Sequence, residues 1–253
     1  MIEACYLLDM RQGQTMKEKM EVLLDQERLL KYQELKSEQT KLLSLGAGVL
    51  LRMAWTEGEL ALLQEERQPV SSREMVPEFS TLSDGEELVL MSPKQVCERL
   101  EELPKAEEPR YWIGEHGKPY FRGSKLCFSL SHSKCMVMCA IADHEIGVDV
   151  QCVTQVNWER LAVRYYSKEE QDYLTLLAKE DAQRARHEFF RLWCRKEAFG
   201  KMTGEGAAPY LGISFLEERE GYRIRDGVVS IGDDQYCNCI CEVWDIYQKR
   251  GRK

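Results

Sequence analysis

The stretch Phe190-Arg191-Leu192-Trp193-Cys194-Arg195-Lys196-Glu197-Ala198 predicts a helix that places a carboxylate where an apolar residue would be expected. Trp193, Glu197 and Lys201 recur at four-residue steps, so they share one face of that helix. An acid and an amine that continue an aromatic stripe are costly to bury unless something pairs with them. A metal ion or a phosphate group would be a suitable partner, so this helix is predicted to supply half of a binding site.

The composition indicates a folded protein that does not bind nucleic acids in general. Hydrophobic residues make up 43% of the 253 residues, which is enough for the core of one large domain or two modest ones. The formal net charge of -8 argues against the basic surface that general nucleic-acid binding requires.

The ten cysteines favour buried thiols over disulfides. Residues 1–6 lack the basic region and apolar run of a signal peptide, and no apolar stretch approaches the length of a membrane span. We therefore expect a cytoplasmic protein with reduced thiols and no membrane association. Cys237, Cys239 and Cys241 alternate as on one face of a strand, whereas a zinc site usually has two-residue gaps and a second ligand pair. Inert, buried cysteines are the favoured interpretation.

Hydrophobic periodicity predicts two rounds of strands and helices. Residues 64–90 lose this periodicity and are expected to form a surface excursion. Gly46 and Gly48 weaken a predicted helix, which close packing against a neighbour or a ligand would justify. The expected helices are 16–35, 40–55, 93–103, a segment from 157, and 181–202; the expected strands are 2–8, 111–113, 119–121, 126–130, 135–142, 145–151, 213–215, 222–225, 228–231 and 236–246.

The order of these elements is strand, helices, strands, followed by strand, helices, strands. This order predicts a mixed α/β (α+β) protein with two similarly built halves that meet near Asp143, residues 1–143 and 144–253.

The strand Ile146-Gly147-Val148-Asp149-Val150-Gln151 places oxygen-bearing side chains on one face. Its apolar residues face one way, while Gly147, Asp149 and Gln151 face the other, and the glycine is expected to leave room for a ligand. An acid on the outer face of a strand is often only solvated. Two carboxylates, Asp149 and Glu197, together with a neutral oxygen would suit Mg²⁺.

The segment Phe128-Ser129-Leu130-Ser131-His132-Ser133 ends an apolar strand with alternating serines. Hydroxyls and an imidazole can donate to phosphate. A plain turn at the end of a strand is the alternative, because serine is common there. A catalytic Ser–His pair is a further alternative, although no Gly-x-Ser-x-Gly motif is present.

Two other groups of residues are less specific. Gly117-Lys118-Pro119 forms a turn that could place a cation over a ligand but needs no ligand to form. Arg28 and Lys31 place cations on the first helical region, and nearby glutamates favour solvent exposure for them.

Taken in order, Gly-Lys-Pro, Ser-Leu-Ser-His-Ser, Gly-Val-Asp-Val-Gln and Phe-x-x-x-Trp-x-x-Lys-Glu-Ala resemble the motifs of the Sfp-type 4′-phosphopantetheinyl transferases. The strong matches cover residues 117–201, and residues 64–110 carry no useful match. The resemblance implies a holo-[acyl-carrier-protein] synthase activity. Such an enzyme moves the phosphopantetheine arm of coenzyme A to a serine of an acyl or peptidyl carrier protein and releases adenosine 3′,5′-bisphosphate.

The resemblance also implies a fold and a site. The family fold is a pseudo-dimer of two α/β halves with the active site in the cleft between them, and one such chain suffices as a monomer. The N-terminal half would bind the nucleotide side of coenzyme A, and the C-terminal half would supply the metal site and the catalytic helix. The implied catalytic residues are Glu197, Lys201 and Asp149; the implied Mg²⁺ ligands are Asp149, Gln151 and Glu197; the implied coenzyme A contacts are Arg28, Lys31, Ser44, Lys118, Pro119, Ser131 and His132.

Gln151 departs from the family pattern, because many members have Glu at this position. A neutral amide is a poorer Mg²⁺ ligand than a carboxylate. Metal binding is still expected, because Mg²⁺ sites often use only one or two carboxylates.

Three alternatives stay open at this point. The chain could be a non-catalytic module of the same fold that binds carrier proteins or nucleotides, or a different Mg²⁺-dependent phosphotransferase, although the Walker pattern is absent. It could also be an α/β protein in which the acid-bearing helix only pairs with Lys or Arg.

Overall fold

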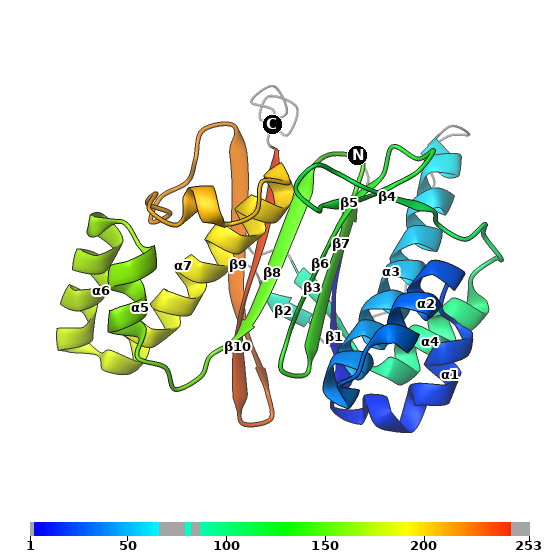
Figure 1. The fold of residues 1–253 in the computed structure, drawn as a ribbon, viewed down its shortest axis with the longest axis horizontal. Helices are drawn as coiled ribbons and strands as arrows, with labels where there is room; N and C mark the ends of the chain where they lie inside the picture. The colour runs from blue at the N-terminus through cyan, green and yellow to red at the C-terminus, as the bar shows by residue number, and fades with distance from the viewer. Residues whose placement is uncertain (1–2, 66–78, 82–86, 244–253) are drawn as a thin grey trace.

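The structure, a computed structural model, describes residues 3–65, 79–81 and 87–243. These residues form a mixed α/β fold with four layers, in which two sheets lie between two groups of helices (Figure 1). One apolar core lies between the sheets, and each sheet shares a further core with its own helices. The predicted α/β class is therefore confirmed, while the likeness of the two halves stays a prediction.

The first sheet contains five strands in the order β2-β3-β1-β7-β6. The central strand β1 runs parallel to β3, and the other neighbouring pairs are antiparallel. The strands are β1 (Glu3–Asp9), β2 (Phe79–Thr81), β3 (Glu87–Met91), β6 (Cys127–Ser133) and β7 (Met136–Ala142).

The second sheet contains three antiparallel strands in the order β8-β10-β9. They are β8 (Ile146–Cys152), β9 (Tyr222–Ile231) and β10 (Asp234–Val243). The predicted boundary at residues 143 and 144 falls in the turn that leads from β7 of the first sheet to β8 of the second. As a domain boundary it stays a prediction.

The helices cover the outer faces of both sheets, and a small hairpin lies over the end of α7 (Figure 1). The first sheet is covered by α1 (Lys17–Val22), α2 (Gln26–Glu34), α3 (Glu38–Glu65) and α4 (Pro93–Glu102), preceded by the 3₁₀ helix η1 (Met10–Met16). The second sheet is covered by α5 (Trp158–Tyr165), α6 (Lys168–Glu180) and α7 (Ala182–Thr203), followed by η2 (Ala208–Tyr210). The hairpin consists of β4 (Tyr111–Ile113) and β5 (Pro119–Phe121).

Side chains of the second sheet alternate between its two cores, as the sequence predicted. Val148 and Val150 of β8 are fully buried against the first sheet, so Gly147 and Asp149 face the helices. On the neighbouring strand β10, Cys237, Cys239 and Cys241 are buried in the core that contains α7.

Gly147 determines how closely α7 approaches β8. A Cβ atom at this position would lie 2.0 Å from the carbonyl oxygen of Ala198 and 2.4 Å from the backbone nitrogen of Met202. Only glycine permits this contact between strand and helix backbone. The expectation that Gly147 leaves room for a ligand is wrong, because the helix backbone occupies that space.

The structure corrects three further expectations. The predicted helix 16–35 is divided into α1 and α2, because the buried side chain of Asp25 caps α2 by accepting from the backbone N–H of Arg28 at 2.8 Å.

The predicted excursion 64–90 contains most of β3, which pairs with the central strand β1, and residues 66–78 and 82–86 lie outside the described residues. Residues 213–215 form no strand, while the predicted strands 222–225 and 228–231 are one strand, β9.

The glycines of α3 pack against neighbouring segments. Cβ atoms at Gly46 and Gly48 would lie 2.6 Å from the sulfur of Met10 and 2.3 Å from a methyl carbon of Leu24, respectively.

No helix within the described residues combines the length and the apolar character that crossing a membrane requires.

Replacing Gly147 by alanine should destabilise the protein by about 3 kcal/mol or more, because strand and helix backbones cannot both keep their places around a Cβ atom. Urea unfolding measures the loss. Gly212→Ala is the matched control, since no atom lies within 4 Å of its added Cβ, and it should change stability by less than about 0.5 kcal/mol. Equal stability of the two variants would contradict the proposed role of Gly147.

Candidate active site

Asp149 lies at the meeting point of β6, β8 and α7. Its side chain is almost fully buried, and one oxygen, Oδ1, accepts from the hydroxyl of Ser131 at 2.6 Å and from the ammonium of Lys201 at 2.7 Å. The other oxygen, Oδ2, is buried without a hydrogen-bond partner. A buried carboxylate oxygen without a donor costs free energy, and a bound cation would offset that cost.

The helix α7 brings a second carboxylate to the same place. Glu197 and Lys201 lie one turn apart on α7, on the face that also carries Trp193. Burial raises the pKa of Glu197, and the negative charge of Asp149 raises it further, while the charge of Lys201 lowers it. The two carboxylates are therefore close enough to repel each other, and Lys201 alone offsets only part of that repulsion.

These residues fit a divalent cation with oxygen ligands. Asp149 Oδ2 has no partner, and the half-buried carboxylate of Glu197 is near enough for the charge of Asp149 to raise its pKa. Gln151 lies two residues after Asp149 on the same face of β8 and is half-buried. Two carboxylates and an amide oxygen are a donor set that Mg²⁺ accepts.

The serines of β6 connect the two sheets. Ser129 Oγ accepts from the backbone N–H of Val148 at 3.0 Å, and Ser133 Oγ accepts from that of Cys152 at 2.9 Å. These two hydroxyls replace backbone partners that the edge of β8 lacks on this side, whereas Ser131 binds the side chain of Asp149. The sequence identified the alternation of these serines but not this function.

The side chain of His132 is exposed, whereas Ser131 before it is buried and Ser133 after it is half-buried. Partial desolvation of the ring lowers the pKa of His132, and the nearby charge of Lys201 lowers it further. The imidazole is therefore neutral at physiological pH, so it can donate one hydrogen bond but carries no charge.

Lys118 is buried and already has partners. Its ammonium donates to the carbonyl oxygen of Met202 at 2.7 Å and pairs with Glu145. Pro119 follows it at the start of β5. The turn that contains both residues is thereby tied to the C-terminal end of α7.

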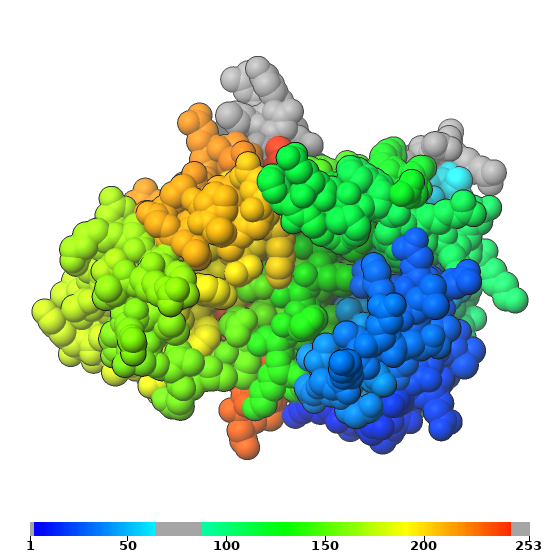
Figure 2. Space-filling view, viewed as in Figure 1, coloured from blue at the N-terminus to red at the C-terminus, as the bar shows by residue number. Residues whose placement is uncertain are grey.

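The three N-terminal candidates lie on α2 and α3. Arg28 stacks over the ring of Tyr111 at 5.3 Å, and its Nε is buried without a partner. Lys31 is exposed in the last turn of α2, and Ser44 is half-buried on α3. On the face shown in Figure 2, the blue helical segments, the green hairpin segment and the yellow-to-orange helical segments come together around a recessed centre. No contact in the described part of the chain joins these three residues to Asp149, and their roles stay predictions.

Sequence reasoning missed a buried ion pair next to the catalytic candidates. Lys196 is fully buried, lies 2.9 Å from Glu170, and also donates to backbone carbonyls of residues 210, 211 and 213. It lies at four- and three-residue steps from the buried Leu192 and Phe199, so its position in the apolar stripe of α7 could have revealed it. Lys196 therefore holds the segment after α7 and faces away from Glu197.

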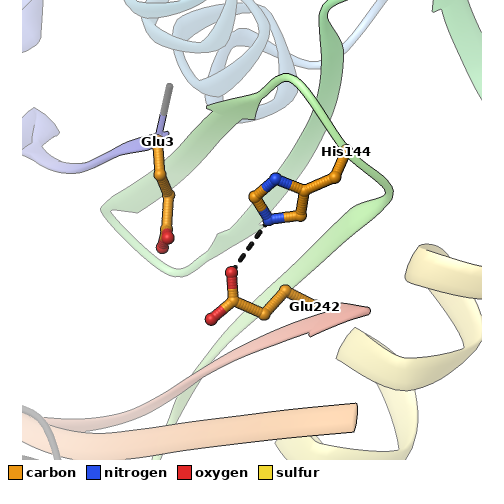
Figure 3. A group of neighbouring side chains, drawn as sticks. All are labelled: Glu3, His144 and Glu242. Atoms are coloured by element: carbon orange, nitrogen blue, oxygen red, sulfur yellow. Dashed lines mark hydrogen bonds and ion pairs between the residues drawn. The ribbon is translucent and has the colours of Figure 1, made fainter. Parts of the chain in front are cut away.

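A second cluster lies where the two sheets meet, at Glu3, His144 and Glu242 (Figure 3). Within residues 3–65, 79–81 and 87–243, it is the only group of three His, Cys, Asp or Glu residues whose ligand atoms lie within 4.8 Å of one another. The guanidinium of Arg225 pairs with both Glu3 and Glu242, so its positive charge already occupies the place that a cation would take. This cluster is an ionic contact between β1, β9 and β10.

Comparisons with known proteins agree with the motifs. Residues 145–245 match the model of the 4′-phosphopantetheinyl transferase superfamily. The 4′-phosphopantetheinyl transferase Sfp of Bacillus subtilis (strain 168) is 30% identical over 158 residues, which are 60% of this chain and 65% of that protein. The 4′-phosphopantetheinyl transferase psf-1 of Bacillus pumilus is 38% identical over 133 residues, 52% of this chain and 53% of that protein.

The matched part therefore spans between about half and two thirds of the length of these relatives. The predicted resemblance to the Sfp-type family is confirmed for this part of the chain. The matched superfamily region contains Asp149, Glu197 and Lys201.

His144 should make stability depend on pH. The hydrogen bond to Glu242, at 2.9 Å, raises the pKa of His144, with a further contribution from Asp143. The stabilisation is fully present below the unfolded pKa of about 6.5 and is lost as the pH rises through the higher folded pKa. His144→Asn should therefore lose about 1 kcal/mol more stability at pH 6 than at pH 9.

Urea unfolding of both proteins at the two pH values measures this difference. The exposed His116 in the hairpin turn provides the control substitution, His116→Asn. A loss for His144→Asn that is the same at both pH values would contradict the ionic contact.

Proposed function

Because residues 145–245 match the 4′-phosphopantetheinyl transferase superfamily, we propose that this protein transfers the 4′-phosphopantetheine arm of coenzyme A to a serine of an acyl or peptidyl carrier protein. The observation that supports this proposal best is the assembly of Asp149, Glu197 and Lys201 between β8 and α7. Two carboxylates and one ammonium around an unpartnered oxygen suit a cation and a diphosphate better than a neutral ligand.

Asp149 and Glu197 would hold Mg²⁺, with Gln151 as a third ligand or a partner through water. When bound, the ion neutralises charge on the diphosphate and stabilises the departing phosphate. This chain's own contribution is to hold both carboxylates at one place on the strand–helix contact that Gly147 permits.

Glu197 would accept the proton of the carrier serine. Burial raises the pKa of Glu197, and a carboxylate with a raised pKa is a stronger base than an ordinary one. The serine oxygen forms a bond to the phosphorus that bears the pantetheine arm, the bond from that phosphorus to the bridging oxygen breaks, and adenosine 3′,5′-bisphosphate leaves with the electron pair. Lys201 would donate to the phosphate oxygens on which negative charge increases.

The remaining contacts to coenzyme A follow the family pattern. We assign Ser131 and His132 to the nucleotide end, where a neutral imidazole donates one hydrogen bond to phosphate. Lys118 and Pro119 would place the hairpin turn beside the adenine, with the ammonium of Lys118 kept on α7. Arg28, Lys31 and Ser44 would contact the 3′-phosphate from α2 and α3.

We further propose that the protein acts as a cytoplasmic monomer, with the nucleotide bound by residues 1–143 and the metal by residues 144–253.

A basic and aromatic surface next to Glu197 is suited to an acidic carrier protein. Trp193, one turn before Glu197, contacts the ring of Tyr165 edge-on at 5.9 Å, and Arg164 lies 5.1 Å over Tyr165. Arg160 and Arg164 are exposed on α5 and form no ion pair with the described residues. Unpaired cations on a chain of net charge -8 would attract and orient an acidic partner.

Transfer of the phosphopantetheine arm can be measured by mass spectrometry of apo carrier proteins after incubation with coenzyme A, Mg²⁺ and the protein. We expect the wild type to add the mass of the phosphopantetheine arm. Asp149→Asn and Glu197→Gln should each lower the rate at least about 100-fold, because each removes a group that acts on the reacting atoms. Lys94→Gln, on the exposed face of α4, should keep the wild-type rate.

Far-UV circular dichroism should show the same fold for all these variants. Wild-type transfer by either carboxylate variant would refute its role. Binding of carrier protein or coenzyme A without any transfer would instead favour the non-catalytic module.

Arg164→Glu should raise the KM for an acidic carrier protein by about tenfold and leave the KM for coenzyme A unchanged, since the substitution reverses one docking charge. The effect should weaken as salt concentration rises. Lys94→Glu makes the same charge change on α4, which covers the first sheet, and should alter neither constant. An unchanged KM for the carrier in Arg164→Glu would place the docking surface elsewhere.

A further inference from the structure

Lys201 supplies the positive charge next to Asp149 in this structure. Its ammonium lies 2.7 Å from Oδ1, the oxygen that also accepts from Ser131. Asp149 is only 5% exposed, and a carboxylate this deeply buried costs free energy unless a positive charge lies beside it. Among the described residues, Lys201 is the only one that forms an ion pair with Asp149.

The ammonium of Lys201 is also free to leave this position. The side chain comes from the last turn of α7 and is 30% exposed, whereas the side chain of Asp149 is 6% exposed. Lysine has a long, flexible stem, so its ammonium can move several ångströms without any shift of the helix. Asp149 has no such freedom, because β8 is held between β10 and the serines of β6.

A divalent cation and this ammonium cannot share Asp149 without cost. A cation on Oδ2 would lie within a few ångströms of the ammonium on Oδ1, and like charges at that separation repel strongly in a partly buried site. Binding of the cation must therefore work against Lys201, unless the ammonium finds another anionic partner.

We propose that Lys201 is a charge placeholder, which neutralises Asp149 before the divalent cation binds and moves from Asp149 to the phosphates of the substrate when the cation arrives. This inference rests on the proposed function in one respect, namely that Asp149 takes a divalent cation. It adds a second task to Lys201: besides contacting phosphate, this residue weakens cation binding in the absence of substrate. Cation and substrate then favour each other's binding, since each removes the cost that the other would meet.

The affinity for Mn²⁺ alone tests this proposal without any measurement of transfer. Titration of the full-length protein, followed by the electron paramagnetic resonance signal of free Mn²⁺, should show binding about tenfold tighter in Lys201→Gln than in the wild type. Lys201→Arg keeps a cation on α7 and should not tighten binding. Lys94→Gln removes an equal charge from the surface of α4 and should bind Mn²⁺ as the wild type does.

Thermal unfolding gives an independent readout. Lys201→Gln should have a lower Tm than the wild type without metal, because Asp149 loses its compensating charge, and Mg²⁺ should raise the Tm of this variant more than that of the wild type. Asp149→Asn combined with Lys201→Gln should lose the tighter binding.

Unchanged or weaker Mn²⁺ binding by Lys201→Gln would overturn the placeholder, as would tighter binding that survives loss of the Asp149 carboxylate. The two proposals fail in different ways. Transfer by the wild type together with unchanged Mn²⁺ affinity in Lys201→Gln would retain the function and refute the placeholder. Tighter binding without transfer to any carrier protein would refute the function and retain the placeholder.

Discussion

The contact of α7 with β8 at Gly147 is the constraint on which the site depends. The carbonyl oxygen of Ala198 approaches the strand so closely that no side chain fits between them. This contact sets the helix in a fixed register against the strand, so that Glu197 and Lys201, on either side of Ala198, lie next to Asp149. The chemistry proposed for this protein therefore follows from a packing requirement between two backbones.

The second requirement is that β6 and β8 stay together although they belong to different sheets. Ser129 and Ser133 bind backbone groups of β8, while Ser131 binds the carboxylate of Asp149 itself. The hydroxyls thereby place β6 of the first sheet against Asp149 of the second. The ionic contact of His144 and Glu242 and the attachment of Lys118 to the end of α7 connect the same two parts of the molecule at other points.

Local patterns in the sequence predicted the parts of this account that depend on one element at a time. The two-residue alternation of β8 identified Asp149, and the four-residue spacing of α7 identified Glu197 and Lys201, because both periods follow from backbone geometry. The buried pair of Lys196 and Glu170 was not predicted, since its partners are distant in sequence. The break at Asp25 was also missed, although the N-cap bond from Arg28 that causes it is local. The serines of β6 were found as a pattern, but their partners on β8 required the three-dimensional structure.

The central claim is that Asp149 and Glu197 hold one divalent cation between β8 and α7. Anomalous diffraction from crystals of the full-length protein grown with Mn²⁺ and coenzyme A tests it most directly. We predict a single strong anomalous peak within ligand distance, about 2.2 Å, of oxygens from both carboxylates. A peak at Glu3, His144 and Glu242 instead, or no peak near Asp149 in a complex that contains coenzyme A, would contradict this account.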